Sequence, residues 1–183
     1  MTGRRWTKIA MIARWKPVHL GHAAVLRALF RASDEVVLGI GSSNKLDVHN
    51  PFDAEETREM LDLVLGADRA RATVLDVPDL GDPPRWRLMV RGMLGPLDAF
   101  VTANAWVKGL MEADYPVVHP ASLLEPREQV RVSGSMVREA MARGERWQAL
   151  VPVAVAQYLE ERGLARRFVR DFGLATLDLT LPR

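Results

Sequence analysis

Two histidines at the spacing His-x-x-His, His19 and His22, stand in a short basic segment of the chain. A metal ion could take both imidazoles, but no carboxylate or cysteine accompanies them nearby, and Arg14 and Lys16 would repel a cation. The same side chains suit an anion, because imidazole N–H groups and cationic groups can together face the phosphates of a nucleotide. The spacing alone also fits two ordinary histidines at the start of a helix, so the surrounding elements must decide.

A second group of hydroxyl and cationic side chains lies far along the chain, at Ser133, Gly134, Ser135 and Arg138. Serines are common first residues of helices, the glycine opens the backbone, and the arginine follows about one turn into the helix. The free N–H groups and the dipole at such a helix start attract phosphate. Taken alone, this pattern fits an ordinary capped helix with a solvated arginine. Together with the two histidines, it favours a second phosphate site.

A strand, a turn and a helix must position the histidines. Residues 9–13 form a short apolar run that is typical of a strand buried on both faces. Pro17 ends this strand, and apolar residues at helical spacing predict a helix over 22–30. The turn between them places the histidines at a helix N-terminus, where Gly21 lets a ligand approach the backbone.

The helix leads into a second apolar run over 36–41, which completes a strand–helix–strand unit with parallel strands and a right-handed crossover. In an open sheet of this kind, ligands bind beyond the carboxyl ends of the strands. The polar loop over 42–52 starts at that edge, and its length and position favour a binding loop over a plain connector. Asp53 and Glu56 then form a capping-box-like pair at the next helix.

Strand and helix patterns keep alternating along the chain. Further strands are predicted over 72–77, 98–102 and 115–118, with helices between and after them. This alternation has no break in composition, so it predicts an α/β fold over 1–163: a single domain with a doubly wound parallel sheet of five to six strands and helices on both faces. Trp86 follows a proline-rich loop at the ligand edge and is either a core residue or a flat ring that stacks on a planar ligand.

The remaining residues, 164–183, are expected to form a C-terminal extension that packs on the domain or lies in a subunit interface. Its basic stretch over 165–170 fits a solvated helical face or a subunit contact better than a nucleic-acid contact. Leucines alternate with polar residues over 176–183, which favours an additional edge strand.

Composition narrows the class of protein further. The 183 residues are 48% apolar and 26% charged with a net charge of +2, which is typical of a globular domain and gives no reason to expect a nucleic-acid or membrane partner. Because the chain has no cysteine, disulfides, thiolate catalysis and cysteine-type zinc sites are excluded. No apolar run approaches the roughly 20 residues of a membrane span. Residues 1–8 lead into a strand and not into a signal-peptide core, so we expect a cytoplasmic protein.

The segment from Arg14 to His22 resembles the first motif of the His-x-Gly-His nucleotidylyltransferase superfamily, and Ser-Gly-Ser-Met-Val-Arg over 133–138 resembles its second motif. Segments between them, together with Trp86 and Asn104, are similar to those of archaeal nicotinamide-nucleotide adenylyltransferases. The likeness implies a Rossmann-like nucleotidylyltransferase domain and, as is common in the family, a homo-oligomer. It also implies transfer of the adenylyl group of ATP to nicotinamide mononucleotide (NMN), giving NAD and pyrophosphate, with Mg²⁺ carried by the triphosphate.

The resemblance also implies roles for single residues, none of which is a metal ligand. The residues expected to act in catalysis are Arg14, His19, His22 and Arg138. The residues expected to bind ATP are Gly21, Ser133, Gly134 and Ser135, to which the basic turn itself adds Lys16. The residues expected to bind NMN are Ser42, Trp86 and Asn104.

Three positions depart from the family pattern. Ala13 replaces a glycine, Trp15 replaces a phenylalanine, and Thr57 stands where an arginine usually follows the acidic pair of the second helix. Arg58 comes next, but neighbouring helical residues point about 100° apart. These differences leave other hypotheses open: transfer to nicotinate mononucleotide, phosphopantetheine or a phospho-sugar alcohol, or a nucleotide-binding sensor without turnover. The adenylyltransferase hypothesis requires the two helix starts, near residues 20 and 134, to converge on one triphosphate.

Overall fold

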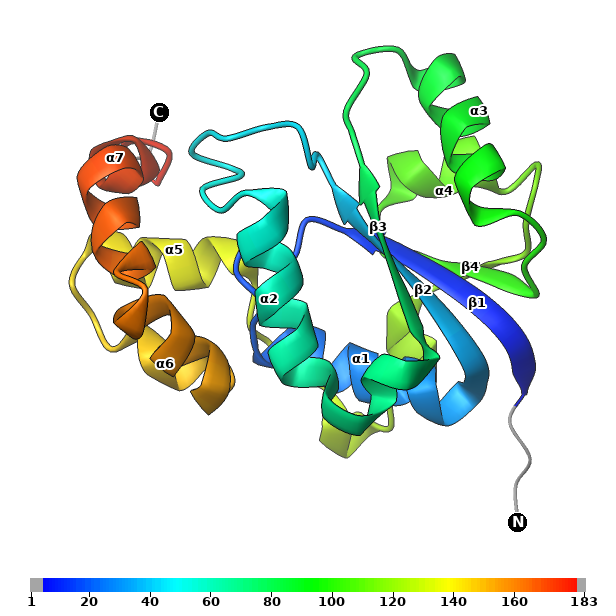
Figure 1. The fold of residues 1–183 in the computed structure, drawn as a ribbon, viewed down its shortest axis with the longest axis horizontal. Helices are drawn as coiled ribbons and strands as arrows, with labels where there is room; N and C mark the ends of the chain where they lie inside the picture. The colour runs from blue at the N-terminus through cyan, green and yellow to red at the C-terminus, as the bar shows by residue number, and fades with distance from the viewer. Residues whose placement is uncertain (1–4, 181–183) are drawn as a thin grey trace.

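Five parallel strands form one sheet within residues 5–180, the part of the chain that the structure, a computed structural model, describes. The strands are β1 (Trp6–Ala13), β2 (Ser33–Gly41), β3 (Ala72–Val77), β4 (Ala99–Val101) and β5 (Val117–Val118). Their order in the sheet is β3-β2-β1-β4-β5, so the chain winds outward from β1 first in one direction and then in the other (Figure 1). The predicted doubly wound parallel sheet is confirmed.

Helices cover both faces of this sheet (Figure 1). One face carries α3 (Pro83–Leu94) and α4 (Ala105–Met111). The other face carries α1 (Leu20–Ala32) and α2 (Ala54–Leu65), with α5 (Gly134–Ala142), α6 (Val153–Glu161) and α7 (Leu164–Asp178) packed together beyond α2. Short 3-10 turns complete the chain: η1 (Gly66–Arg71), η2 (Pro120–Leu123), η3 (Pro126–Glu128) and η4 (Trp147–Leu150).

The central strand β1 is buried on both faces, as its unbroken apolar run predicts. Ile9 and Met11 belong to the core under α1 and α2, whereas Ala10 belongs to the core under α3 and α4. β1 pairs in parallel with β2 on one side and with β4 on the other. Its carboxyl end at Ala13 therefore opens between the ends of two neighbouring strands, where an open parallel sheet binds ligands.

The predicted helix starts near residues 20 and 53 are present. α1 begins at Leu20, slightly before the predicted start, because His19 is its N-cap: the Nδ1 atom of His19 accepts a hydrogen bond from the backbone N–H of His22 at 3.3 Å. α2 follows Asp53, which forms the predicted capping box with Glu56.

The C-terminal segment is helical, so the predicted edge strand over 176–183 is wrong for the residues that the structure describes. α7 extends to Asp178 and packs against α5 and α6. The buried residues of this segment, Leu164, Phe168 and Thr176, are spaced as on one face of a helix. Burial of that face stabilises a helix, although a few leucines alternate with polar residues as in a strand. Residues 181–183 of that prediction lie outside the described residues. Within 5–180, no helix is long and apolar enough to cross a membrane.

Candidate functional site

The starts of α1 and α5 lie side by side and form what we call the helix-start corner. The guanidinium group of Arg138, in α5, donates a hydrogen bond to the carbonyl oxygen of Lys16 at 2.9 Å. A Cβ atom added at Gly134 would lie 3.6 Å from that oxygen and 4.0 Å from the ring of His19. Ser133 is the N-cap of α5, and its hydroxyl accepts a backbone hydrogen bond. The structure thus brings together segments that are 122 residues apart in sequence.

His19 and His22 stack on each other in this corner. Their ring centroids are 3.6 Å apart, and Trp15 packs on His22 at 4.7 Å. Burial and the nearby charge of Arg138 lower the pKa of His19 to about 4, and burial lowers the pKa of His22 well below its usual value. Both imidazoles are therefore neutral near pH 7. Because Nδ1 of His19 accepts a hydrogen bond, its proton is on Nε2, which leaves one N–H donor for a ligand oxygen.

These neutral histidines predict a pH dependence of stability. The free energy of unfolding of the unliganded protein is expected to fall as the pH drops from 6.5 to about 4. In that range the unfolded chain binds protons on histidines that stay neutral in the folded protein, so protonation favours unfolding. Urea denaturation at several pH values measures the fall. The fall in the free energy of unfolding should be shallower in His19→Asn, because the unfolded chain then has one histidine fewer to protonate. Equal slopes in His19→Asn and the wild type would contradict the assignment.

Two cationic side chains are buried in the helix-start corner without a carboxylate partner. Lys16 is 2% exposed and donates to the carbonyl oxygen of Ser42 at 3.1 Å, and Arg138 is 8% exposed. Within residues 5–180, no ion pair holds either side chain. Burial lowers the pKa of both, with Arg14 contributing to the fall for Arg138 to about 10. Buried positive charge without a partner is costly, so the corner favours a bound anion.

A cavity of about 590 Å³ opens at the carboxyl edge of the sheet. Its walls come from the ends of β1 and β2, the loop before α3, and the first turns of α3 and α4. The predicted site residues that line it are Arg14, Ser42, Trp86 and Asn104. The predicted residues that lie outside it, in the helix-start corner, are Lys16, His19, Gly21, His22, Ser133, Gly134, Ser135 and Arg138. The hydrogen bond from Lys16 to Ser42 joins the two parts.

Asn104 and Trp106 form one wall of the cavity at the start of α4. Oδ1 of Asn104 accepts hydrogen bonds from the backbone N–H groups of Trp106 and Val107, so its amide NH₂ group is the part that remains for a ligand. Trp106 is 57% exposed, and its ring centroid lies 6.3 Å from that of Trp86. Sequence reasoning did not select Trp106. The available signal was an aromatic side chain in the first turn of a helix that follows the carboxyl end of a strand.

Gly21 has a packing role that the sequence did not indicate. A Cβ atom at this position would lie 2.7 Å from the carbonyl oxygen of Val132 and 3.1 Å from the ring of His19. Glycine therefore lets α1 approach the segment that leads into α5.

Gly21→Ala is expected to destabilise the protein by about 1–3 kcal/mol, because the added methyl group overlaps the carbonyl oxygen of Val132. The matched control is Gly92→Ala, inside α3, where a Cβ meets no atom within 4 Å. The free energy of unfolding of Gly92→Ala should rise by about 0.5–1 kcal/mol, since alanine is the better helix former. Chemical denaturation of both variants gives these values. A Gly21→Ala protein as stable as the wild type would rule out the close packing.

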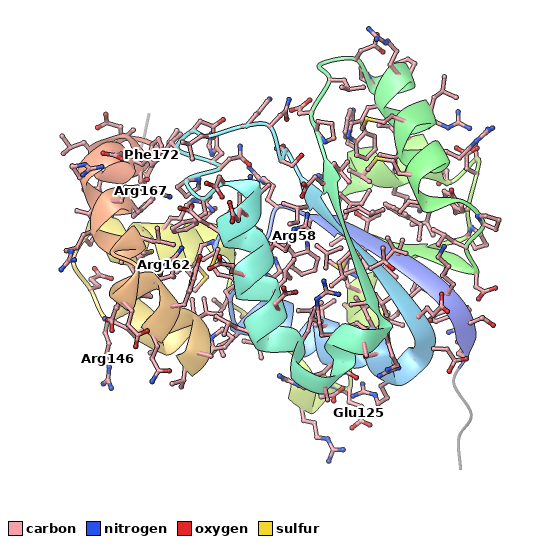
Figure 2. All side chains as sticks on the ribbon, in the orientation of Figure 1. Arg58, Glu125, Arg146, Arg162, Arg167 and Phe172 are labelled. Carbon is pink, nitrogen blue, oxygen red and sulfur yellow. The ribbon has the colours of Figure 1, made fainter. Side chains whose placement is uncertain are left out.

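Thr57 and Arg58 stabilise α2 and its contact with the sheet. Thr57 is fully buried, and its hydroxyl donates to the carbonyl oxygen of Asp53. Arg58 donates to the carbonyl oxygen of Val74 and pairs with Asp76, both in β3 (Figure 2). Arg58 therefore points toward the sheet and does not take the place of an arginine at position 57.

An arginine from the far end of the chain lies at the start of α2. Arg167, in α7, binds both carboxylate oxygens of Glu56 and donates to the carbonyl oxygen of Pro51 at 3.1 Å (Figure 2). The loop over 42–52 is also held by the pair of Lys45 and Asp79 at 2.6 Å. α7 thus helps to fix the loop that begins at the cavity.

Comparison with known proteins identifies similar sequences over most of the chain. The family model for cytidylyltransferase-like proteins matches residues 12–140. A nicotinamide-nucleotide adenylyltransferase from Methanoculleus marisnigri is 35% identical over 164 residues, which cover 88% of this chain and 95% of that protein. One from Thermococcus onnurineus is 33% identical, over 85% of this chain and 83% of that protein.

Solved structures share the fold. A bifunctional NMN adenylyltransferase/ADP ribose pyrophosphatase from Francisella tularensis superposes with a TM-score of 0.74 at 15% identity, over 97% of this chain and 58% of that chain. Its complex with AMP and a manganese ion gives a TM-score of 0.72 at 15% identity, over 97% of this chain and 57% of that chain. The chain therefore spans little more than half of these bifunctional proteins, and the likeness at this identity concerns the fold.

Proposed function

The chain belongs to the cytidylyltransferase-like family, and from this premise we propose how its helix-start corner and its cavity carry out adenylyl transfer. The relatives that span most of the chain are nicotinamide-nucleotide adenylyltransferases. The reaction is transfer of the adenylyl group of ATP to the phosphate of NMN, which gives NAD and pyrophosphate.

The observation that carries this proposal is the buried positive charge of Lys16 and Arg138 where two helix starts meet. Phosphoryl and nucleotidyl transfer require little covalent chemistry from the protein, so positioning and charge neutralisation supply most of the catalysis. An oxygen of the NMN phosphate forms a bond to the α-phosphorus of ATP. The bond from that phosphorus to the bridging oxygen breaks, and pyrophosphate leaves with the electron pair. The phosphate nucleophile is already ionised at neutral pH, so no general base is needed.

The helix-start corner holds the triphosphate in this proposal. His19 donates its Nε2–H group to a phosphate oxygen, and His22 supports the ring of His19 by stacking. Arg138 neutralises charge, and the free N–H groups of α5 add further donors. The other residues proposed to contact or border the phosphates are Arg14, Lys16, Gly21, Ser133, Gly134 and Ser135.

The cavity holds the acceptor in this proposal. Trp86 offers an indole face on which the nicotinamide ring stacks. The amide NH₂ group of Asn104 donates to the carboxamide or the ribose of NMN. Ser42 lines the same cavity, and its carbonyl oxygen accepts a hydrogen bond from Lys16. The phosphate of NMN then lies beside Arg14, between the two parts of the site.

Mg²⁺ is proposed to enter with ATP. In the part of the chain that the structure describes, no group of three or more His, Cys, Asp or Glu side chains is placed to hold a metal ion. This arrangement fits Mg²⁺, which keeps several water ligands and binds largely through substrate phosphates in such sites. When bound, the ion neutralises part of the triphosphate charge. The Francisella tularensis complex with AMP and a manganese ion supports a divalent cation.

Incubation of the purified protein with ATP, Mg²⁺ and NMN tests the proposal, and NAD and pyrophosphate should form in equal amounts. Nicotinate mononucleotide or phosphopantetheine in place of NMN tests the other acceptors. ATP binding without pyrophosphate release from any acceptor would instead favour the sensor hypothesis. The homo-oligomer, the cytoplasmic location and the absence of a nucleic-acid partner stay predictions, and sedimentation analysis checks the first of them.

A further inference from the structure

Two indole rings lie next to each other in the wall of the cavity. Trp86 comes from the first turn of α3 and Trp106 from the first turn of α4, and both line the cavity wall. Their ring centroids are 6.3 Å apart, and their planes meet at 43°. The proposal for Trp86 leaves Trp106 without a role, although a tryptophan that is 57% exposed beside a cavity presents a large apolar face.

The backbone that carries Trp106 is firmly held. Asn104 caps α4: its Oδ1 atom accepts hydrogen bonds from the backbone N–H groups of Trp106 and Val107 at 2.9 and 3.2 Å. The N–H of Asn104 in turn donates to the hydroxyl of Thr102, a buried residue directly after β4, at 3.1 Å. Hydrogen bonds to the end of the neighbouring strand and within the helix start therefore hold the backbone that carries the indole.

The charges around the two rings favour a cation. The carboxylate of Asp82 lines the same cavity and forms no ion pair within residues 5–180. Asp79 also lines it, paired with Lys45. Arg14, the cation that lines the cavity, comes from the end of β1. Indole faces attract cations through their quadrupole, and the pyridinium ring of NMN is flat and positively charged.

We propose that Trp106 is a specificity-determining residue, which forms with Trp86 an aromatic clamp for the cationic pyridinium ring of the acceptor. The inference rests on the proposed function, because it names the part of NMN that this wall of the cavity recognises. The ring stacks on one indole while the second indole, inclined at 43° to the first, packs against its edge, and both arrangements are favourable for aromatic pairs.

Calorimetric titration with NMN alone tests the clamp without requiring turnover. Trp106→Ala should weaken NMN binding about tenfold, and Trp106→Phe should restore most of it because phenylalanine keeps an aromatic face. Reduced NMN has the same phosphate and carboxamide on a neutral dihydropyridine ring, so Trp106→Ala should change its affinity by less than about threefold. Leu88→Ala, which removes an exposed apolar side chain of α3 that does not line the cavity, should bind as the wild type does.

Steady-state kinetics provide the second measurement. In Trp106→Ala the KM for NMN should rise about tenfold, while the KM for ATP and kcat stay within about threefold, because Trp106 contacts only the acceptor. NMN affinity within twofold of the wild type in Trp106→Ala, or an equal loss for reduced NMN, would overturn the inference. Wild-type protein that binds NMN but forms no NAD would instead overturn the proposed function and leave the binding result for Trp106 standing.

Discussion

Replacing His19 by alanine is expected to lower kcat by about 10²- to 10³-fold, while the KM values for ATP and NMN change by less than about fivefold. The reason is that the neutral imidazole of His19 offers one fixed Nε2–H donor beside Arg138, and donors of this kind stabilise charge that develops in the transition state. The rate of NAD formation under saturating substrates measures the loss. If His19→Ala kept more than a tenth of the wild-type kcat, His19 would not be a catalytic residue.

The N-cap role of His19 must be separated from its catalytic role. His19→Asn keeps a good capping side chain at the start of α1 but cannot place the same N–H donor, so it should fold stably and remain slow. His119→Ala is the matched control, because His119 caps η2 in the same way, with Nδ1 accepting the N–H of Ala121 at 3.2 Å, and does not line the cavity. Its kcat should equal that of the wild type. If His19→Asn kept the wild-type kcat, the loss of kcat in His19→Ala would be due to the lost N-cap alone.

Arg138→Met is expected to lower kcat/KM by about 10³-fold, the largest effect among charge substitutions in the molecule. This guanidinium is the buried cation that also links α5 to the carbonyl oxygen of Lys16, so its removal takes away both charge and position. Methionine fills a similar volume. Arg138→Lys should recover little, because an ammonium group cannot bind the Lys16 carbonyl and a phosphate in the same forked geometry. Initial rates at low substrate concentration give kcat/KM.

Arg143→Met is the matched control for Arg138→Met. Arg143 lies at the other end of α5, where it is exposed and pairs with Glu139 at 2.8 Å. An exposed pair of this kind contributes little to stability, so kcat/KM should stay at the wild-type value. If Arg138→Met kept kcat/KM within tenfold of the wild type, the helix-start corner would not be the triphosphate site.

Local patterns in the sequence were sufficient for the parts of the fold that local forces decide. The apolar run of β1 predicted a strand buried on both faces, and Asp53 with Glu56 predicted a capping box that the structure contains. The same reasoning predicted that Ser133 starts a helix, because its hydroxyl needs only the next turn of backbone. Each of these features depends on neighbours within a few positions along the chain.

Features that depend on distant contacts could not be predicted in this way. Leucines at alternating positions near residue 176 suggested a strand, but Phe168 and Thr176 pack into the core at helical spacing. Nothing in the sequence indicated that Gly21 would pack against the carbonyl oxygen of Val132, or that Trp106 would lie next to Trp86. These contacts join segments that are far apart in sequence, so they can be predicted only when the order of the strands in the sheet is known.

The contacts of Arg167 with Glu56 and Pro51 have a consequence for folding during translation. Arg167 is translated 111 residues after Glu56 and 116 residues after Pro51. A nascent chain that has completed its sheet can pair Lys45 with Asp79, but it still lacks the contact of Arg167 with the end of the segment over 42–52. The candidate site is therefore complete only after residue 167 has left the ribosome, and a stalled chain that ends before residue 164 should be cut by added protease within the segment over 42–52, whereas the released protein should resist.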